Sequence, residues 1–377
     1  MTNKILILSA SAGAGHLRAA QALEKALIER DPSLEVFHLD TLDYTNKLFR
    51  RLYGRIYMEL VNRSPQAYGW LYNHLDKPWQ YRRRRLALDK LNARPFIKVM
   101  ETLQPDLVIC THFLPSEIIA WLRENHRLRT RQQALVITDF DLHALWLTGH
   151  VDHYFVALEE TRVHLEALGI PGDSITVSGI PVDPVFARHR DKTQSRLDLK
   201  LDRDLPTLLV TAGGLGMGPV GLILQSLDQV RTPSQAVVIC GKGQELKHRV
   251  DQHLRQRPHN GPVRITSVGY TGDMDLYMSA ADLLLGKTGG LTTSEALTKG
   301  LAFVIVDPIE GQEERNADHL LEEGAAIRCN NLPALGYKVD RLLGDPKRLK
   351  VMQHKSLRLA RPKAAFTIVD KLLSSLF

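Results

Sequence analysis

The sequence predicts an α/β protein built from two Rossmann-like, doubly wound domains. Eleven short apolar runs, rich in leucine and β-branched residues, alternate with helical patterns along the chain, as parallel strands covered on both faces do. The length of 377 residues exceeds what one hydrophobic core usually supports. A charged stretch with three prolines at 179–206 separates the runs into two series, and we expect the link between the domains there.

The expected elements follow in chain order. Strands of the first series lie at 4–8, 34–39, 106–110, 134–138, 153–158 and 174–178, and those of the second at 206–211, 235–240, 262–267, 282–286 and 302–306. Helical patterns such as 17–30 and 291–299 separate them, which predicts right-handed βαβ units. We therefore expect an N-terminal domain at 1–185 and a C-terminal domain at 190–350. A closing helical segment follows at 351–377, for which a return onto the N-terminal domain is one option.

Cysteine content and hydropathy indicate a reducing compartment. The three cysteines are widely spaced and form no CxxC pair, which argues against a disulfide framework or a zinc site. No apolar run approaches the roughly 18–20 residues of a membrane-spanning helix. The apolar run after Lys4 is too short for a signal peptide. We expect a cytoplasmic location, with no transmembrane helix and no signal peptide.

Three glycine loops follow expected strands and open helices, where doubly wound folds bind ligands. None fits GxxxxGK[ST], so nucleotide hydrolysis by a P-loop is not expected. The first loop alone permits a nicotinamide cofactor or an ordinary tight turn, whereas the second and third would meet at one sheet edge and hold a diphosphate. The loops contain Gly13 and Gly15, then Gly213, Gly214, Gly216 and Gly218, then Gly286, Lys287, Thr288, Gly289 and Gly290.

Polar residues near the third loop suit the rest of a nucleotide sugar. Glu295, about two turns into the following helix, can accept both hydroxyls of a ribose. Gln312, Glu313 and Asn316 stand where the next strand leads into a helix, and their donors and acceptors suit sugar hydroxyls. Each is also an ordinary helix residue when considered alone, so the prediction depends on their gathering at one sheet edge.

Longer motifs around these residues resemble a known group of enzymes. GKTGGLTTSEALTKG and EGQEERNADHLLEEGAA resemble the nucleotide-sugar site of GT-B glycosyltransferases. The nearest resemblance is to monogalactosyldiacylglycerol synthases and bacterial processive diacylglycerol glucosyltransferases, and a more distant one is to the N-acetylglucosaminyltransferase of lipid II synthesis. SASAGAGHLRAAQAL, ITDFDLHALW, TAGGLGMGPV and VGYTGDM match further motifs of the family in the same order.

The resemblance implies a GT-B fold, with two domains facing a central cleft, and an inverting transfer of galactose or glucose from a UDP-sugar to the hydroxyl of diacylglycerol. It implies a membrane glycolipid as product, and no metal or other cofactor. The DFD sequence at 139–141 has the form of a DxD metal motif, yet it lies in the acceptor half. We therefore expect no metal there.

The resemblance also assigns residues. Those implied on the acceptor side are Gly13, Gly15, His143 and Trp146, with His16 and Asp139 as catalytic candidates. Those implied on the donor side are the glycines at 213, 214, 216 and 218, Gly269 and Tyr270 at the uracil, Lys287, Thr288, Gly289, Gly290, Thr292, Glu295, Gln312, Glu313 and Asn316. Either His16 or Asp139 is the general base, and His16 could instead stabilise the transition state. Asp183 stands where the family often has Arg, so one cation near the pyrophosphate is missing.

Residues 47–98 carry most of the basic character. Thirteen Lys and Arg face three acids there, while the whole chain has a net charge of only +7. Basic and aromatic residues together suit an anionic bilayer surface; a nucleic acid or a merely solvated helical insertion are the alternatives. We expect membrane contact, and no nucleic acid, through Arg50, Arg51, Arg55, Trp79, Arg82, Arg83, Arg84 and Arg85.

The main hypothesis is thus a glycosyltransferase bound peripherally to the cytoplasmic side of the cell membrane. A UDP-sugar epimerase of the same fold and a non-enzymatic, membrane-bound UDP-sugar sensor are the alternatives. The sequence does not decide between glucose and galactose, between one transferred sugar and several, or which oligomeric state the protein adopts.

Overall fold

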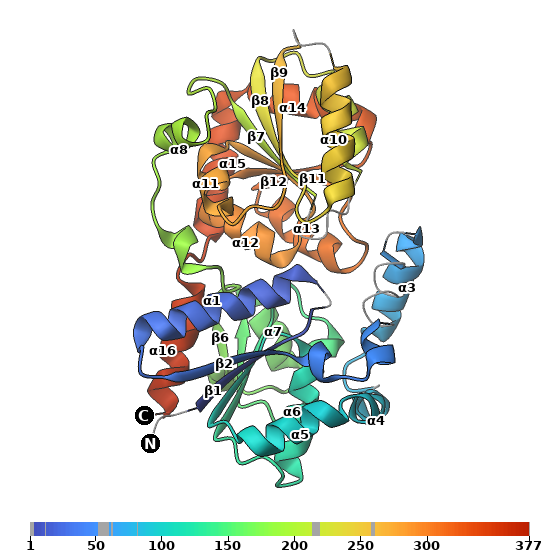
Figure 1. Cartoon of the computed structure of the whole chain (residues 1–377), viewed down its shortest axis with the longest axis vertical. Helices are drawn as coiled ribbons and strands as arrows, with labels where there is room; N and C mark the ends of the chain where they lie inside the picture. The colour runs from blue at the N-terminus through green and yellow to red at the C-terminus, as the bar shows by residue number, and fades with distance from the viewer. Residues whose placement is uncertain are drawn as a thin grey trace. The chain divides into compact units, whose positions relative to one another are not determined.

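The computed structural model describes residues 4–11, 13–51, 60–61, 63–80, 82–212, 219–257 and 261–376. The chain divides into two compact units (Figure 1). The first contains Met1–Pro184, Glu310–Gln312 and Arg361–Phe377, and the second contains Val185–Ile309 and Glu313–Ala360. Each unit has a six-stranded parallel sheet with helices on both faces, so the predicted α/β class with two doubly wound sheets is confirmed.

The sheet of the first unit has the strand order β2-β1-β3-β4-β5-β6. Its strands are β1 (Lys4–Ser9), β2 (Glu35–Asp40), β3 (Leu107–Cys110), β4 (Gln132–Val136), β5 (His153–Val156) and β6 (Ile175–Val177). Its helices are α1 (Ala14–Arg30), α3 (Pro65–Leu75), α4 (Arg82–Asn92), α5 (Arg94–Leu103), α6 (Phe113–Glu124), α7 (Glu159–Ala167) and α16 (Ala364–Leu376).

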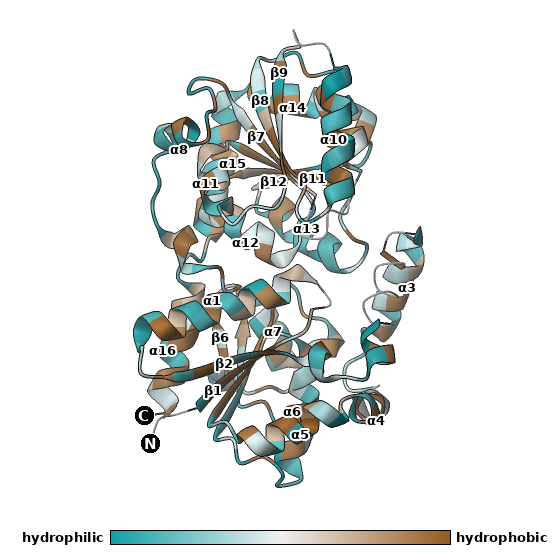
Figure 2. Ribbon diagram, in the orientation of Figure 1, coloured by the Kyte–Doolittle hydropathy of each residue, from teal (hydrophilic) through white to brown (hydrophobic). Residues whose placement is uncertain are grey.

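Alternation along β1 places its side chains in two cores. Ile5 and Ile7 pack with α1 and α16 on one face, whereas Leu6 and Leu8 pack with α5 and α6 on the other. Both faces are covered, so the central strands of the sheet are largely apolar (Figure 2). The helix α16 therefore belongs to the first unit, although it closes the chain.

The sheet of the second unit has the order β12-β11-β10-β7-β8-β9. Its strands are β7 (Thr207–Thr211), β8 (Ser234–Ile239), β9 (Val263–Val268), β10 (Leu283–Gly286), β11 (Ala302–Val306) and β12 (Ala326–Cys329). Its helices are α8 (Lys192–Asp198), α9 (Val220–Leu227), α10 (Gln244–Gln256), α11 (Met274–Ala280), α12 (Gly290–Thr298), α13 (Gln312–Glu322, whose first residue is grouped with the first unit), α14 (Leu335–Leu343) and α15 (Pro346–Leu359).

All eleven predicted strands are present, and the sequence interpretation missed two elements. The strand β12 has four residues, includes the charged Arg328 and pairs only with β11, so it lacked a long apolar signal. The helix α8 lies in the expected link between the domains. Its Arg196 is buried, and the guanidinium donates to Asp282. A charged inner face removes the apolar periodicity by which a helix is recognised.

The closing segment is divided between the two units. The helix α15 packs on α12 and β11 in the second unit, and residues 361–377 belong to the first. Within the described ranges no helix is long and apolar enough to cross a bilayer.

Candidate active site

His16 lies in the first turn of α1, immediately after β1, and is partly buried. Thr111 follows β3, and Thr138 and Asp139 follow β4. Because β1, β3 and β4 are neighbouring parallel strands, their carboxyl ends bring these residues to one edge of the sheet.

The hydrogen bonds of His16 assign its tautomer. The ring Nδ1 lies 3.0 Å from the backbone oxygen of Thr111 and 2.9 Å from Oγ1 of Thr138. A carbonyl oxygen can only accept, so Nδ1 carries the hydrogen and Nε2 has the free lone pair. The hydroxyl of Thr111 in turn donates to the backbone oxygen of His16 at 2.9 Å. His16 therefore offers a basic nitrogen on the side of the ring opposite these contacts.

Burial lowers the pKa of His16 below its ordinary 6.5, while the negative charge of Asp139 and the bond to Thr111 act in the opposite direction. The net lowering leaves the imidazole neutral at pH 7. A neutral imidazole with a free Nε2 is the form that can accept a proton from a hydroxyl.

Two neighbouring histidines have the opposite tautomer. Nδ1 of His112 accepts from Leu114 N at 3.0 Å, and Nδ1 of His143 accepts from Leu145 N at 3.1 Å. In His143 the Nε2–H then donates to the backbone oxygen of Tyr72 in α3, at 2.9 Å. His143 therefore anchors α3 and has no nitrogen left for a proton transfer.

Aromatic rings surround His16. The rings of His112 and Trp146 lie 4.6 and 6.0 Å from it, centroid to centroid, and Trp146 is buried. A Cβ built on Gly13 meets no atom within 4 Å, so packing does not demand glycine there. Of the four predicted acceptor-side residues, Gly13, Gly15 and Trp146 thus lie beside His16, whereas His143 lies under α3.

Asp139 is buried, and its Oδ1 accepts a hydrogen bond of 2.9 Å from Nε2 of Gln312. Both residues are grouped in the first unit. The sequence interpretation placed Gln312 at the transferred sugar and Asp139 among the possible bases. The bond between them leaves the Gln312 amide oxygen available as an acceptor for a hydroxyl.

Donor-side residues of the second unit form one bonded cluster. Thr288, two residues after the end of β10, is buried and donates through Oγ1 to the backbone oxygen of Glu313 at 2.6 Å. Asn316 Nδ2 donates to the Thr288 oxygen at 3.0 Å, and Glu313 Oε2 accepts from Ile309 N at 2.8 Å. The third glycine loop and the start of α13 are therefore tied together at the carboxyl edge of the sheet, as predicted from their positions.

Three other predicted donor-side residues lie on the third glycine loop or on α12, the helix that follows it. Lys287 Nζ is 3.3 Å from Oδ2 of Asp307, the residue after β11. Thr292 is partly buried in α12, and Glu295 in the same helix is buried. The assignment of Glu295 to a ribose stays a prediction.

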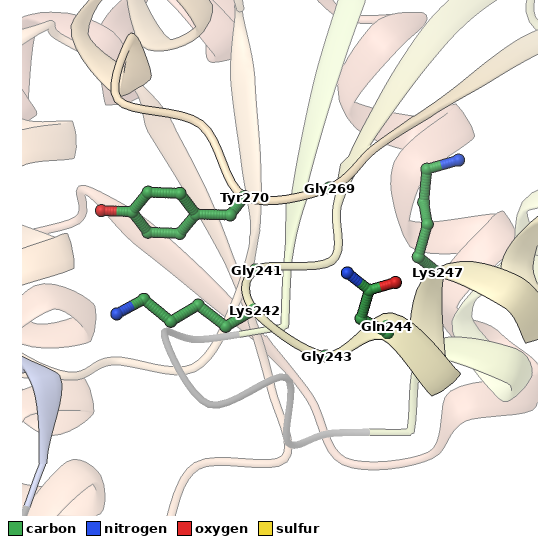
Figure 3. A pocket seen from close by; sticks show the side chains of 7 residues that line it. All are labelled: Gly241, Lys242, Gly243, Gln244, Lys247, Gly269 and Tyr270. Carbon is green, nitrogen blue, oxygen red and sulfur yellow. The ribbon is translucent and has the colours of Figure 1, made fainter.

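A cavity of about 370 Å³ opens at the carboxyl ends of β8 and β9 (Figure 3). Its lining includes the predicted Gly269 and Tyr270. Figure 3 shows the side chains of Lys242 and Tyr270 extending to one side, and Lys247 on the other. The ammonium of Lys242 lies 5.3 Å from the Tyr270 ring centroid, a cation–π distance. The lining residues are Gly241, Lys242, Gly243, Gln244, Lys247, Gly269 and Tyr270.

Apart from Lys242, which could replace the missing cation near the pyrophosphate, the sequence interpretation did not include the loop 241–247 in the site. The signal was available, because GKG follows an expected strand and opens a helix in the manner of the other glycine loops. Lys247 is bonded to Asp251 at 2.6 Å and to Ser267 at 3.0 Å, so its charge is compensated, whereas Lys242 faces an aromatic ring.

Several predicted residues cannot be placed or have other partners. Gly213, Gly214, Gly216, Gly218 and Arg55 lie outside the described residues, as do the side chains of Arg82–Arg85. Arg50 pairs with Asp43 at 2.7 Å, Arg51 is exposed, and Trp79 is 42% exposed. Asp183, which stands in place of the family's arginine, pairs with Lys25 at 2.5 Å. In the part of the chain that the structure describes, no three His, Cys, Asp or Glu side chains gather as metal ligands.

Family models match both halves of the chain. Residues 16–182 match the monogalactosyldiacylglycerol (MGDG) synthase model, and residues 207–368 match the glycosyltransferase family 28 C-terminal domain. With its two doubly wound sheets, the protein is thus a glycosyltransferase of the GT-B class. The N-terminal part of the chain thus matches the MGDG synthase family and the C-terminal part matches glycosyltransferase family 28, in agreement with the resemblance of its motifs.

Curated relatives match over nearly the whole chain. A processive diacylglycerol beta-glucosyltransferase of Staphylococcus saprophyticus is 28% identical, over 99% of this chain and 93% of the relative. Another processive diacylglycerol beta-glucosyltransferase, of Bacillus licheniformis, is 29% identical over 95% of this chain and 92% of the relative.

Solved structures share the fold. Acinetobacter baumannii MurG has a TM-score of 0.63 at 17% identity, covering 99% of both chains. The UDP co-structure of S. aureus MnaA has a TM-score of 0.62 at 15% identity, and the match covers 100% of this chain and 98% of MnaA. Anabaena Alr3699/HepE in complex with UDP-glucose has a TM-score of 0.56 at 14% identity, and the match covers 99% of both chains.

Proposed function

We propose that the protein transfers a hexose from a UDP-sugar to the hydroxyl of diacylglycerol, with inversion at the anomeric carbon. The matches of both halves to the family models support this reaction class, and the names of the relatives support the acceptor. The acceptor oxygen bonds to the anomeric carbon. The bond from that carbon to the β-phosphate oxygen breaks, and UDP leaves with its electron pair.

His16 takes the proton of the acceptor hydroxyl in this proposal. The observation that carries the assignment is the bond from His16 Nδ1 to the Thr111 carbonyl, which leaves Nε2 as the basic nitrogen. Neither His112 nor His143 presents a basic Nε2, because Nδ1 accepts a backbone hydrogen bond in both. Asp139 then acts as a negative charge that favours the imidazolium, and it remains the rival candidate for the base.

The second unit supplies the donor site. The N-terminus of α12 and Lys287 suit the diphosphate by hydrogen bonding and charge, whereas the buried hydroxyl of Thr288 is donated to Glu313 and holds the loop in place. Glu313 and Asn316, held against the same loop, suit sugar hydroxyls, together with Gln312. The cavity beside Tyr270 suits a flat, polar ring such as a nucleobase.

Glucose is the favoured sugar, because the relatives cited above are named glucosyltransferases. Galactose is the alternative that the synthase model suggests. The cited relatives are named processive, whereas the synthase model is named for a monogalactosyl product. The number of sugars that this chain adds must therefore be measured.

We propose that no metal takes part. The side chains at the candidate site offer hydrogen-bond donors, a lysine and a helix N-terminus, all of which can stabilise a departing diphosphate. The test is the initial rate in excess EDTA, which we expect to match the rate without chelator; a rate restored only by Mg²⁺ or Mn²⁺ would contradict this.

Peripheral attachment to an anionic bilayer completes the proposal. Exposed apolar side chains accompany the basic segment, including Leu48, Trp70, Leu88 and Leu91, and each nearby Lys or Arg adds about 1 kcal/mol at an anionic surface. Replacing the four arginines 82–85 by glutamine should weaken co-sedimentation with anionic vesicles, whereas glutamine at Lys347, Arg348, Lys350 and Arg358 of α15 serves as a charge-matched control. Equal binding of both variants would contradict a role for the basic segment.

The decisive experiment offers UDP-glucose and UDP-galactose separately on vesicles that contain diacylglycerol and an anionic lipid, followed by mass analysis of lipids and nucleotides. We expect a glycolipid, and His16→Ala should lower its rate by about 10²–10⁴-fold with UDP binding retained. His164→Ala, an exposed histidine of α7, is the control. A folded, UDP-binding protein that makes no glycolipid from either donor would overturn the proposal, and an isomerised UDP-sugar would identify an epimerase.

A further inference from the structure

Two threonines from neighbouring strand ends hold His16. Thr111 is fully buried and Thr138 is 5% exposed. The Thr111 backbone oxygen and the Thr138 hydroxyl lie 3.0 and 2.9 Å from the same ring nitrogen. Two oxygen atoms therefore share one N–H group, while Nε2 makes neither contact.

We propose that Thr138 is a positioning residue, which acts with the Thr111 carbonyl to fix His16 in the tautomer that has its hydrogen on Nδ1. This inference rests on the proposed role of His16 as the base. In the alternative tautomer the bare Nδ1 would face the Thr111 carbonyl oxygen at 3.0 Å, lone pair against lone pair. The Thr138 hydroxyl blocks rotation of the ring away from that carbonyl by supplying a second acceptor.

The same contacts stabilise the proton that Nε2 gains. Once Nε2 is protonated the ring is a cation, and hydrogen bonds from a cation are stronger than neutral ones. The Asp139 carboxylate contributes charge from the same loop as Thr138, and His112 faces the ring from the start of α6. The oxygens thus do what a carboxylate does for the histidine of a hydrolase triad, without placing a full negative charge on the ring N–H.

Thr111 also fixes the backbone beneath the ring. Its hydroxyl donates to the backbone oxygen of His16, so one residue binds both the main chain and the side chain of the histidine. The first turn of α1 is therefore held at the end of β3, and the only ring motion left is rotation, which Thr138 opposes.

The test compares Thr138→Val, which keeps the shape and removes the hydroxyl, with Thr138→Ser, which restores it. Thr148→Val is the matched control, because Thr148 is buried in the same unit and bonds to Ser116, 2.9 Å away. We expect Thr138→Val to lower kcat about 3- to 30-fold with little change in the KM for the UDP-sugar. Thr138→Ser should recover most of kcat, and Thr148→Val should retain it.

The pH profile separates positioning from general damage. Removing an acceptor destabilises the imidazolium, so the pKa of His16 falls and the acid limb of kcat/KM moves to lower pH in Thr138→Val. In Thr138→Ser the acid limb of kcat/KM should return to its wild-type pH, and in Thr148→Val it should not move. An unmoved limb together with an unchanged kcat in Thr138→Val would overturn the inference.

A second measurement does not need activity. Two-bond ¹H–¹⁵N correlation NMR of the histidine side chains, with His16 assigned from the His16→Gln variant, should show the hydrogen on Nδ1 in the wild type and a mixture in Thr138→Val. A wild-type Nε2–H tautomer would overturn the inference. If the tautomer is as expected but His16→Ala keeps full activity, the role of His16 as base fails while the contact geometry stands.

Discussion

The Nζ atom of Lys287 lies 3.3 Å from Oδ2 of Asp307, so the lysine assigned to the donor diphosphate already has a carboxylate beside it. The two residues follow β10 and β11, which pair in parallel. Asp307 has a φ of +49°, in the left-handed region that Asp tolerates better than most residues. A diphosphate that binds Lys287 must therefore compete with the Asp307 carboxylate for the lysine charge.

Asp307→Asn should therefore tighten the binding of UDP and of the UDP-sugar. An ion pair this exposed contributes about 0.2–1 kcal/mol, so we expect the Kd for UDP from calorimetry to fall by roughly 1.4- to 5-fold. Asp318→Asn, which removes the same charge from an exposed position on α13, should leave it unchanged. Weaker binding in Asp307→Asn would mean that the carboxylate orients Lys287 instead of competing for it.

The pH dependence of the reaction should report the pKa of His16. Burial lowers this pKa from 6.5, and the base must be neutral to accept a proton. Activity should therefore hold from neutral pH down to below 6.5 and fall only as the pH drops through the lowered pKa. A plot of kcat/KM against pH on neutral vesicles measures it, and an acid limb above 6.5 would argue against His16 as the titrating group.

His143→Ala should loosen α3 without removing a proton acceptor. The imidazole donates to the Tyr72 oxygen and accepts from Leu145 N, and leaving buried partners unpaired costs about 1–3 kcal/mol. Hydrogen exchange should accelerate in residues 65–75, while the acid limb of the rate profile stays where it is. His164→Ala should change neither, and a shifted limb in His143→Ala would point to a direct role in chemistry.

Arg196→Met should destabilise the second unit. The guanidinium is buried and donates to Asp282 at 2.6 Å, to the Ala280 oxygen at 3.0 Å and to the Arg203 oxygen at 2.6 Å. Breaking a buried pair costs about 3–5 kcal/mol, which urea unfolding can measure. Lys192→Met removes the more exposed cation on the same Asp282 and should cost under about 1 kcal/mol; equal losses would contradict the role of burial.

The sequence placed His16, Thr288 and Asn316 at the carboxyl edges of the sheets because their signals are local. A glycine loop after an apolar strand marks the sheet edge, and every parallel strand ends at that edge. The contacts that define the chemistry are not local: Thr111 and Thr138 are 95 and 122 residues from His16. Their meeting depends on the order β1-β3-β4, which apolar runs do not encode.

The partner of Lys287 was missed for the same reason. From the sequence alone Asp307 is an ordinary turn residue, because the sequence does not show that β10 and β11 are neighbours. Gln312 lies after a strand, as the sequence predicted. Its amide group donates a hydrogen bond to Asp139, and no rule based on sequence spacing predicts that contact. Side-chain pairing across the ends of a sheet thus requires the topology, even where every strand is recognised.

The position of α16 has a consequence for synthesis on the ribosome. Ile368, Val369 and Leu372 fill the core beside α1, and Arg30 binds Asp370 with two hydrogen bonds of 2.8 and 2.9 Å. The sheet of the first unit is translated first, yet the helix that covers α1 emerges only after all of β7–β12. The apolar surface beside α1 therefore stays uncovered while the second unit is made, so we expect nascent chains of this protein to bind chaperones until α16 has been synthesised.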